Sequence, residues 1–427
     1  MILLVCAVLS GEMDAPVLSP VGLTPTTEVP QGPPMSITIA AGEDVSARLR
    51  TLTAHSHVTL LPGNHAGPLV IDRPLTLRGP ARVVGPGTGS VILVAADDVT
   101  VEALELTGSG IDATRGDAGV VVLGSRAHLI GLRIVETFLG VDFRASHQSE
   151  LRDSTILGRE EGPIGTHGDG VRLWESDDNL IIGNHLTHVR DMVAWYSERN
   201  RFEGNRVEHS RYGVHLMHAN QNVLLGNSFI DDVVGAFVMY SSGVTIQDNL
   251  VLRADGPAGV GVGLKESDAI TVAGNRLLAC TVGLYLDSTP HRTDGYARIA
   301  DNLIAYSHVG VRFQGIHRGA SLSGNDMHEN QVQVRVNGGG QAKVIEFLGN
   351  RWSDYVGYDL DDDGVGDLPY QPRSLTRAVV ARRPAAAWFD GTPAAALLDL
   401  LGEAFPMWSP PPLLTDPRPR VGRLEQG

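Results

Sequence analysis

The sequence predicts an all-β fold: a right-handed single-stranded parallel β-helix (solenoid) with a C-terminal cap and a short helix. Two observations predict it, a Gly-Asn pair that returns at nearly constant spacing and one or two short apolar strands within each period. The steps between successive asparagines, two of which follow Asp instead of Gly, are 21, 22, 22, 26, 27, 23 and 25 residues. These asparagines are Asn184, Asn205, Asn227, Asn249, Asn275, Asn302, Asn325 and Asn350.

The residue pair itself suits a corner of a stacked coil. Gly or Asp before the Asn tolerates a left-handed φ, which a sharp turn between two strands requires. Asn side chains that recur at the same corner can hydrogen-bond along a ladder from coil to coil. We therefore expect one Asn ladder running through the repeats.

The chain divides into five segments by composition. Coils are expected over residues 36–350, where weaker apolar strands extend the array toward the N-terminus. Residues 2–9 form an apolar run too short to span a bilayer, so residues 1–14 are interpreted as the remnant of an export signal. Residues 15–35 are a Pro-rich linker, 351–384 an Asp-rich cap segment, and 385–427 a C-terminal helix with a Pro-rich tail.

The net charge and the cysteine content restrict which partners and which cysteine-based sites are expected. A net charge of −15 argues against nucleic acid and against polyanionic polysaccharide as the principal partner. Of two cysteines only Cys280 lies in the coils, so we expect neither a disulfide in the mature chain nor a cysteine metal cluster.

Alignment of the coils on the Asn separates inward from outward positions. Eleven residues before the Asn lie aliphatic or small residues, which we expect inside: Leu173, Ala194, Leu216, Val238 and Leu264. By strand alternation the preceding and following positions point outward. The outward column one residue later contains Trp174, Trp195, Met217 and Met239, which is unlike a solvated surface.

Three interpretations of this column remain open. A loop or the C-terminal segment could cover it, or it could be a docking surface for another protein, since exposed apolar patches rarely persist without use. It could also capture a metal: His215, Met217 and Met239, with His218 and His167 near by, offer imidazole and thioether ligands that favour copper, especially Cu(I). This last reading needs a bend at the coil corner, because one strand cannot direct His215 and His218 to the same face.

The segment 359–367 predicts a calcium site. Its carboxylates at Asp359, Asp361, Asp363 and Asp367 surround Gly364, whose freedom permits a sharp turn around a hard cation. Position 12 of this loop is Tyr370, so the segment is not an EF-hand. The alternative is a solvated acidic turn, but several carboxylates this close repel one another unless a cation neutralises them.

An enzyme of the polysaccharide lyase, hydrolase or epimerase type is the second functional hypothesis, because parallel β-helices often act on polysaccharides. The candidate general acid and general base for such an enzyme are His167, Asp169, Asp177 and Asp178. A glycosidase needs two carboxylates facing one substrate, and the aligned outward column contains no carboxylate pair on adjacent coils. We therefore expect no catalytic residues.

An ordered set of motifs resembles the NosD family, the periplasmic β-helical maturation proteins of nitrous oxide reductase. The resemblance covers nearly the whole chain after the linker. Its motifs lie at residues 101–110, 166–174, 212–217, 349–354, 358–364 and 369–372 and before Phe405-Pro406.

The resemblance implies a periplasmic, non-enzymatic accessory protein that acts with an ABC transporter in maturation of the copper-sulfide centre. Implied partners are the transporter permease, nitrous oxide reductase or its apo form, and a copper chaperone. Copper would be bound transiently. Because the Pro-rich tail cannot join the coils, we expect Met407, Trp408, Leu413 and Leu414 to dock onto the transporter while the preceding helix caps the solenoid.

Overall fold

The computed structural model describes residues 30–316, 318–337, 341–389, 392–405 and 410–422, and it is a parallel β-solenoid. The chain forms two compact units. The first comprises the described chain up to Ala236 with Gly256–Ala258, and the second comprises Phe237–Asp255 and the described chain from Gly259 onward. β23 (Val234–Met239) contains the boundary. Among the described residues, no helix is long and apolar enough to cross a membrane.

The first unit begins with β1 (Ser36–Ile39), and α2 (Val45–Arg50) follows it. The N-cap of α2, Asp44, accepts a hydrogen bond from the Ala47 N–H. The unit also contains the 3-10 helix η1 (Ile164–Thr166). One of its sheets consists of long parallel strands in the order β4 (Leu69–Ile71), β6 (Ile92–Val94), β8 (Ala118–Val122), β11 (Leu139–Arg144), β14 (Val171–Trp174), β17 (Asp191–Trp195) and β20 (Tyr212–Met217). We call this the long-strand sheet.

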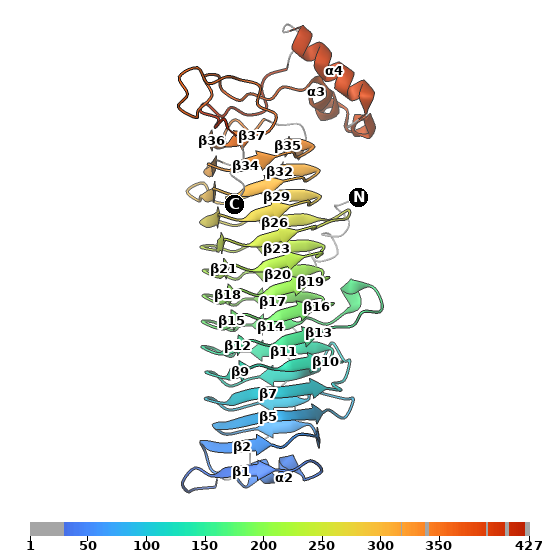
Figure 1. The fold of residues 1–427 in the computed structure, drawn as a ribbon, viewed down its shortest axis with the longest axis vertical. Helices are drawn as coiled ribbons and strands as arrows, with labels where there is room; N and C mark the ends of the chain where they lie inside the picture. Colours follow the sequence, from blue (N-terminus) through green and yellow to red (C-terminus); the bar gives the residue numbers. More distant parts are fainter. Residues whose placement is uncertain (1–29, 317, 338–340, 390–391, 406–409, 423–427) are drawn as a thin grey trace. The chain divides into compact units, whose positions relative to one another are not determined.

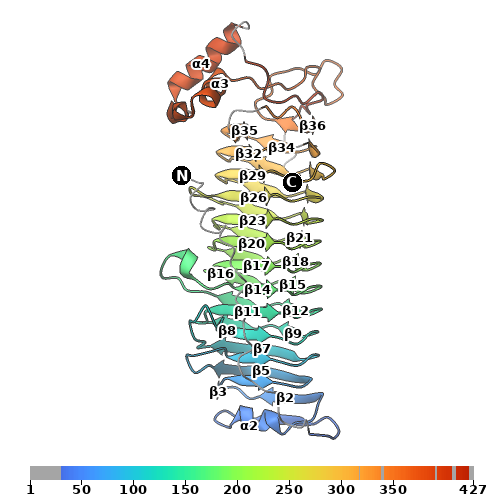
Figure 2. The same cartoon turned by 180° about the vertical axis from the view of Figure 1, so that it is seen from behind.

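The other strands of the first unit form two parallel ladders on either side of the Asn corner (Figures 1 and 2). They are β1 (Ser36–Ile39), β2 (Ser56–Leu60), β3 (Asn64–Ala66), β5 (Leu75–Val84), β7 (Thr100–Thr107), β9 (His128–Ile130), β10 (Arg133–Val135), β12 (Glu150–Arg152), β13 (Thr155–Leu157), β15 (Leu180–Ile182), β16 (His185–Thr187), β18 (Arg201–Glu203), β19 (Arg206–Glu208), β21 (Val223–Leu225) and β22 (Ser228–Ile230).

The second unit repeats this arrangement. Its long strands are β26 (Val260–Lys265), β29 (Val282–Asp287), β32 (Val309–Gln314) and β35 (Val332–Val336). Its short strands are β24 (Thr245–Gln247), β25 (Leu250–Leu252), β27 (Ile270–Ala273), β28 (Arg276–Leu278), β30 (Ala297–Ala300), β31 (Leu303–Ala305), β33 (Ala320–Ser323), β34 (Asp326–His328), β36 (Glu346–Leu348) and β37 (Arg351–Trp352). After them come α3 (Leu375–Arg382), the 3-10 helix η3 (Pro384–Phe389) and α4 (Pro393–Ala404).

The predicted Asn ladder is confirmed. In the first unit the Asn205 side-chain oxygen accepts from both the backbone N–H and the side-chain amide of Asn184, each at 3.0 Å. The same pair of bonds links Asn249 to Asn275 in the second unit, at 2.9 Å each. The preceding glycines adopt the left-handed conformation, as at Gly204 with φ 61°. A second ladder, at Asn179, Asn200 and Asn222, was not anticipated.

The inward column is also as expected. Leu173, Ala194 and Leu216 are fully buried in the first unit, as are Val238 and Leu264 in the second. In-register parallel pairing places each residue of this column directly over the corresponding residue of the neighbouring coil, which gives a narrow and continuous aliphatic core.

The C-terminal segment departs from expectation at two points. The helix expected over 385–404 is divided into η3 and α4, each of which begins at a proline. The Pro-rich tail, expected to stay apart from the coils, instead packs against the last one: the Leu413 carbonyl accepts from the Ala342 N–H at 2.8 Å, Arg420 donates its N–H to the Asn350 carbonyl at 2.9 Å, and Leu414 is fully buried. The expectation that Leu414 is free to dock onto a transporter is therefore wrong.

The tail also ends the Asn ladder. The Asp416 carboxylate occupies the position of the next Asn and accepts from the Asn350 N–H and side-chain amide, both at 2.9 Å. It further accepts from the Gly349 N–H at 3.0 Å and from the Trp352 indole at 3.1 Å. Asp416 is fully buried, so the cap of this end is the tail segment rather than α4.

Candidate functional site

The strongest candidate surface lies on the outer face of the long-strand sheet of the first unit. Register places Trp174 beside Trp195 and Trp195 beside Met217, at the ends of β14, β17 and β20. All three side chains are half-buried. Met239, also half-buried, ends β23 and belongs to the second unit.

Aromatic rings pack along this surface. The Trp174 ring meets the rings of Trp195 and Tyr196 edge-on, each at 5.6 Å between centroids. The Tyr196 ring is stacked on His218 at 5.2 Å with 3° between their planes. Tyr196 and His218 both adopt left-handed φ at the coil corner, and Tyr196 is 49% exposed. We call Trp174, Trp195, Tyr196, Met217 and His218 the aromatic surface.

One polar atom in it lacks a partner. The indole N–H of Trp195 is buried and has no hydrogen-bond acceptor among the described residues. Buried donors in folded proteins are nearly always bonded, so this indole is an exception among the polar atoms of the unit.

His215 lies beneath this surface and not on it. It is only 7% exposed, stacks on Tyr212 at 4.8 Å and lies edge-on to Trp195. Burial, together with the positive charge of Arg211, lowers the pKa of His215 to about 4, so its imidazole is neutral at neutral pH. His218, in contrast, is exposed at the coil corner. As strand alternation required, His215 and His218 do not point to the same face.

Met217 and His218 of this surface, with the buried His215 beneath it, provide soft ligand atoms. His215 and Met217 are two apart on β20 and so share one face, and a neutral imidazole with a thioether is a combination that Cu(I) accepts. Among the described residues, no group of three His, Cys, Asp or Glu converges here to form a closed metal site. His167 does not contribute, because its ring nitrogens lie 2.9 Å and 3.1 Å from the carbonyls of His188 and Glu161.

A buried network of carboxylates and arginines borders the aromatic surface and was missed from sequence. Asp142, in register with Arg172, accepts from Arg172 at 2.7 and 2.8 Å and from Arg144 at 2.5 Å. Asp169 accepts two bonds of 2.8 Å from Arg190. Asp191 pairs with Arg211 in the same way. The signal was an Asp and an Arg recurring on successive coils.

Of these three carboxylates only Asp142 lies in the aligned outward positions, where it is in register with Arg172; Asp191 is in register with Tyr212 at the other end of β17, so the network lies beside the aligned column. Asp142, Asp169 and Asp191 are each at most 1% exposed and are held by arginines. Burial raises the pKa of Asp169, an effect that Arg190 opposes. A general acid or base must reach its substrate, so carboxylates enclosed in this way are better suited to fixing the outer face of the sheet.

The acidic loop of the second unit gathers three of its four predicted ligands. Ligand oxygens of Asp359, Asp361 and Asp363 lie within 4.8 Å of one another. Asp367 is not among them, and its carboxylate accepts a 2.7 Å bond from the Leu360 N–H. Gly364 takes a left-handed φ of 81°, the turn conformation predicted for it.

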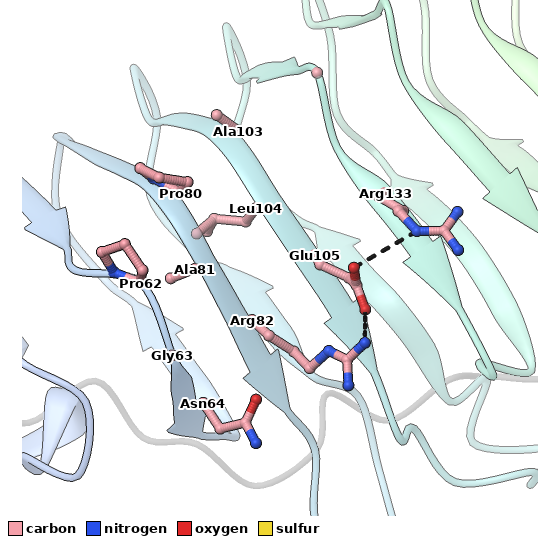
Figure 3. Close-up of a pocket in the computed structure, with 11 residues that line it drawn as sticks. Pro62, Gly63, Asn64, Pro80, Ala81, Arg82, Ala103, Leu104, Glu105 and Arg133 are labelled. Atoms are coloured by element: carbon pink, nitrogen blue, oxygen red, sulfur yellow. Dashed lines mark ion pairs between the residues drawn. The ribbon is translucent and has the colours of Figure 1, made fainter.

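A groove of about 540 Å³ lies over β5, β7 and β10 of the first unit (Figure 3). Glu105 pairs there with Arg82 and, at 3.5 Å, with Arg133. The described lining contains one carboxylate, so the two-carboxylate arrangement of a glycosidase is not found in this groove. No sequence signal pointed to it, since its residues come from β3, β5, β7 and β10 and the turns beside them, with different spacing.

Comparison with known proteins decides the family. The family model described as "Periplasmic copper-binding protein (NosD)" matches residues 148–357. The "Probable ABC transporter binding protein NosD" of Pseudomonas aeruginosa is 30% identical over 364 residues, covering 82% of this chain and 84% of that one. The chain belongs to the NosD family. A protein of the same name from Stutzerimonas stutzeri is also 30% identical, over 82% of this chain and 83% of its own.

Solved structures support the fold alone. The A-module of the mannuronan C-5 epimerase AlgE6 from Azotobacter vinelandii superposes with a TM-score of 0.53 at 15% identity, over 69% of this chain and 91% of that module. A likeness at this identity carries no epimerase activity over to this NosD family member.

Proposed function

We propose that this chain is a periplasmic accessory protein that acts with an ABC transporter in maturation of the copper-sulfide centre of nitrous oxide reductase. The names of the relatives and of the family support periplasmic location, copper and a transporter. The observation that carries the proposal is the aromatic surface, where the half-buried side chains of Trp174, Trp195 and Met217 lie together with the exposed rings of Tyr196 and His218.

The proposal assigns no catalytic step to the chain. Its aromatic surface is a docking place for the apo reductase or for a copper chaperone, and copper is cargo that meets His215, Met217 or His218 in transit. The polysaccharide lyase, hydrolase or epimerase alternative would need accessible acid and base groups, and the carboxylates of this face are enclosed by arginines.

Complementation tests the proposal. A host lacking its own copy would receive the chain with Trp174→Ala and Trp195→Ala, and the copper content and activity of its reductase would be measured. We expect a folded protein in normal amount and a reductase deficient in copper. The matched control is Tyr306→Ala, because Tyr306 is an aromatic residue that is 57% exposed in the second unit. Full reductase activity in the double variant would refute the docking role.

A calcium ion in the 359–367 loop is a second, separate proposal. Two of its three clustered carboxylates, Asp361 and Asp363, are exposed, so a bound cation would chiefly relieve repulsion and order the loop. Docking of the tail onto the transporter remains proposed for Met407 and Trp408, which lie outside the described residues. Of the other two candidates, Leu413 is half-buried and Leu414 is excluded by its burial.

A further inference from the structure

The helices α3 and α4 place small or polar residues in their mutual contact and large apolar residues outside it, which is the reverse of the usual packing of helices in water. Small or polar residues of α4 face α3: Ala395 is 5% exposed, its carbonyl accepts from the Thr376 hydroxyl at 2.9 Å, and Gly402 is buried. A Cβ at Gly402 would lie 2.9 Å from the Leu375 side chain. On the α4 side the contact is therefore made by small residues and by Asp399, with Leu375 and Thr376 of α3 opposite them.

The large apolar residues point away from that contact. Leu397, Leu400 and Leu401, which alternate with the inward positions 395, 399 and 402 at helical spacing, are 57%, 59% and 36% exposed. In the adjoining η3, Trp388 is 89% exposed and Phe389 is 62% exposed. An aqueous environment penalises such an arrangement, because burying one leucine stabilises a protein appreciably and four α4 leucines remain outside.

Packing of this kind is typical of helices in contact with lipid. Where the surroundings are as apolar as leucine, helices associate through small residues and turn their large side chains outward. α4 has 12 residues, about 18 Å at 1.5 Å per residue, and so is too short for a hydrocarbon core of about 30 Å. Such a helix lies in the interface, with aromatic residues at the headgroup level.

The charges of the segment fit an anionic surface although the whole chain is acidic. Arg373 and Arg383 are exposed at the two ends of α3. Asp399 is turned inward, where it accepts from the Ser374 hydroxyl at 2.9 Å and the Thr376 N–H at 2.8 Å. Among the side chains that the structure describes in this segment, the exposed ones are thus arginine or apolar, in a chain whose net charge is −15.

We propose that the segment α3–η3–α4 binds the surface of a bilayer containing anionic phospholipid, with the apolar side of α4 and Trp388 in the interfacial layer. This inference is independent of copper handling, and it goes beyond the transporter partnership by giving the chain its own contact with lipid. A protein groove in the transporter is the competing occupant.

Vesicle flotation of the full chain tests the proposal. Vesicles of phosphatidylcholine alone and of phosphatidylcholine with phosphatidylglycerol are compared, and we expect binding to the anionic vesicles. The variant L397Q/L400Q/L401Q should reduce the partition coefficient by about 100-fold, since three leucines no longer enter the interface. The variant R373Q/R383Q should weaken binding to anionic vesicles about ten-fold and leave the neutral ones unchanged.

The control variant is V356S/L360Q, because Val356 and Leu360 are 96% and 80% exposed in the second unit outside the helices. It should bind vesicles as wild type does. The proposal would be overturned if the wild-type chain bound neither kind of vesicle. It would also be overturned if the L397Q/L400Q/L401Q variant bound vesicles as strongly as the wild-type chain does. Binding to detergent-purified transporter that depends on these leucines, without any vesicle binding, would assign the segment to a protein groove instead.

Discussion

Asp416 should be the residue on which the C-terminal end of the solenoid depends most. Its carboxylate accepts five hydrogen bonds and donates none, since its partners are the N–H groups of Gly349, Asn350 and Arg418 and the side-chain donors of Asn350 and Trp352. Within the ladder each Asn both accepts and donates, whereas the last position meets only donors. An acid is therefore required there, and the change Asp416→Asn tests that requirement.

The magnitude follows from these contacts. An Asn amide would direct its NH2 at donors now bonded to one oxygen, for example at Gly349 and Arg418 if Oδ1 is the atom replaced. Hydrogen bonds to charged groups contribute about 1.5 to 3 kcal/mol each, so losing two costs about 3 to 6 kcal/mol. Because solenoid stability is shared mainly between neighbouring coils, the loss should stay near this end.

Hydrogen exchange measures that local loss. Amides in residues 346–352 should exchange about 100-fold faster or more in Asp416→Asn, while those of the first unit keep wild-type protection. Thr415→Ala is the control, since Thr415 is exposed and its recorded contact is a 3.4 Å bond from Gln371. Unchanged exchange at 346–352 in Asp416→Asn would refute the argument that the carboxylate completes the ladder.

Three further predictions concern the two proposed sites and pH. Alanine variants of Trp174, Trp195 and Met217 should keep wild-type circular dichroism and melting temperature yet fail in reductase maturation; early melting would mean that these side chains act in packing. A chelator should lower the melting temperature of the wild-type chain, and Asp361→Asn with Asp363→Asn should abolish that sensitivity; identical melts with and without chelator would remove the calcium proposal. The pKa of His215 is lowered from 6.5 to about 4, so the free energy of unfolding should decrease as the pH falls from about 6.5 to about 4. In that range the unfolded state binds a proton that the folded state excludes. The loss should reach about 3 kcal/mol relative to His215→Gln in denaturant titrations, and parallel pH profiles for the two proteins would contradict it.

The ladder and the core could be read from sequence because both depend on local spacing. Gly204 and Asn205 specify a left-handed turn with a side chain that bonds one coil away, and this unit recurs often enough to be recognised. The inward position of Leu216 follows from the alternation of a single strand. Partial burial of Trp174 and Trp195, by contrast, depended on neighbouring rings that alternation does not describe.

The candidate site was only partly predictable for the same reason. Its aromatic and thioether residues appear in an aligned column, but His215, predicted outward, is buried beneath them. The Asp142–Arg172 pair joins side chains 30 residues apart, and longer intervening loops displaced these coils from the regular period. Strand alternation predicts on which face of the sheet a side chain lies. The surrounding loops and neighbouring side chains determine how much of it is exposed to water.

The sequence by itself determined the coil, its corner residues, its aliphatic core and the family, because each is written in short-range spacing repeated many times. Only the tertiary structure decided how the array ends. Asp416 reaches Asn350 across 66 residues, and α4 turns its leucines outward because Gly402 and Ala395 allow close approach to α3. Such contacts occur once in the chain, and a single long-range contact leaves no periodic trace in the sequence.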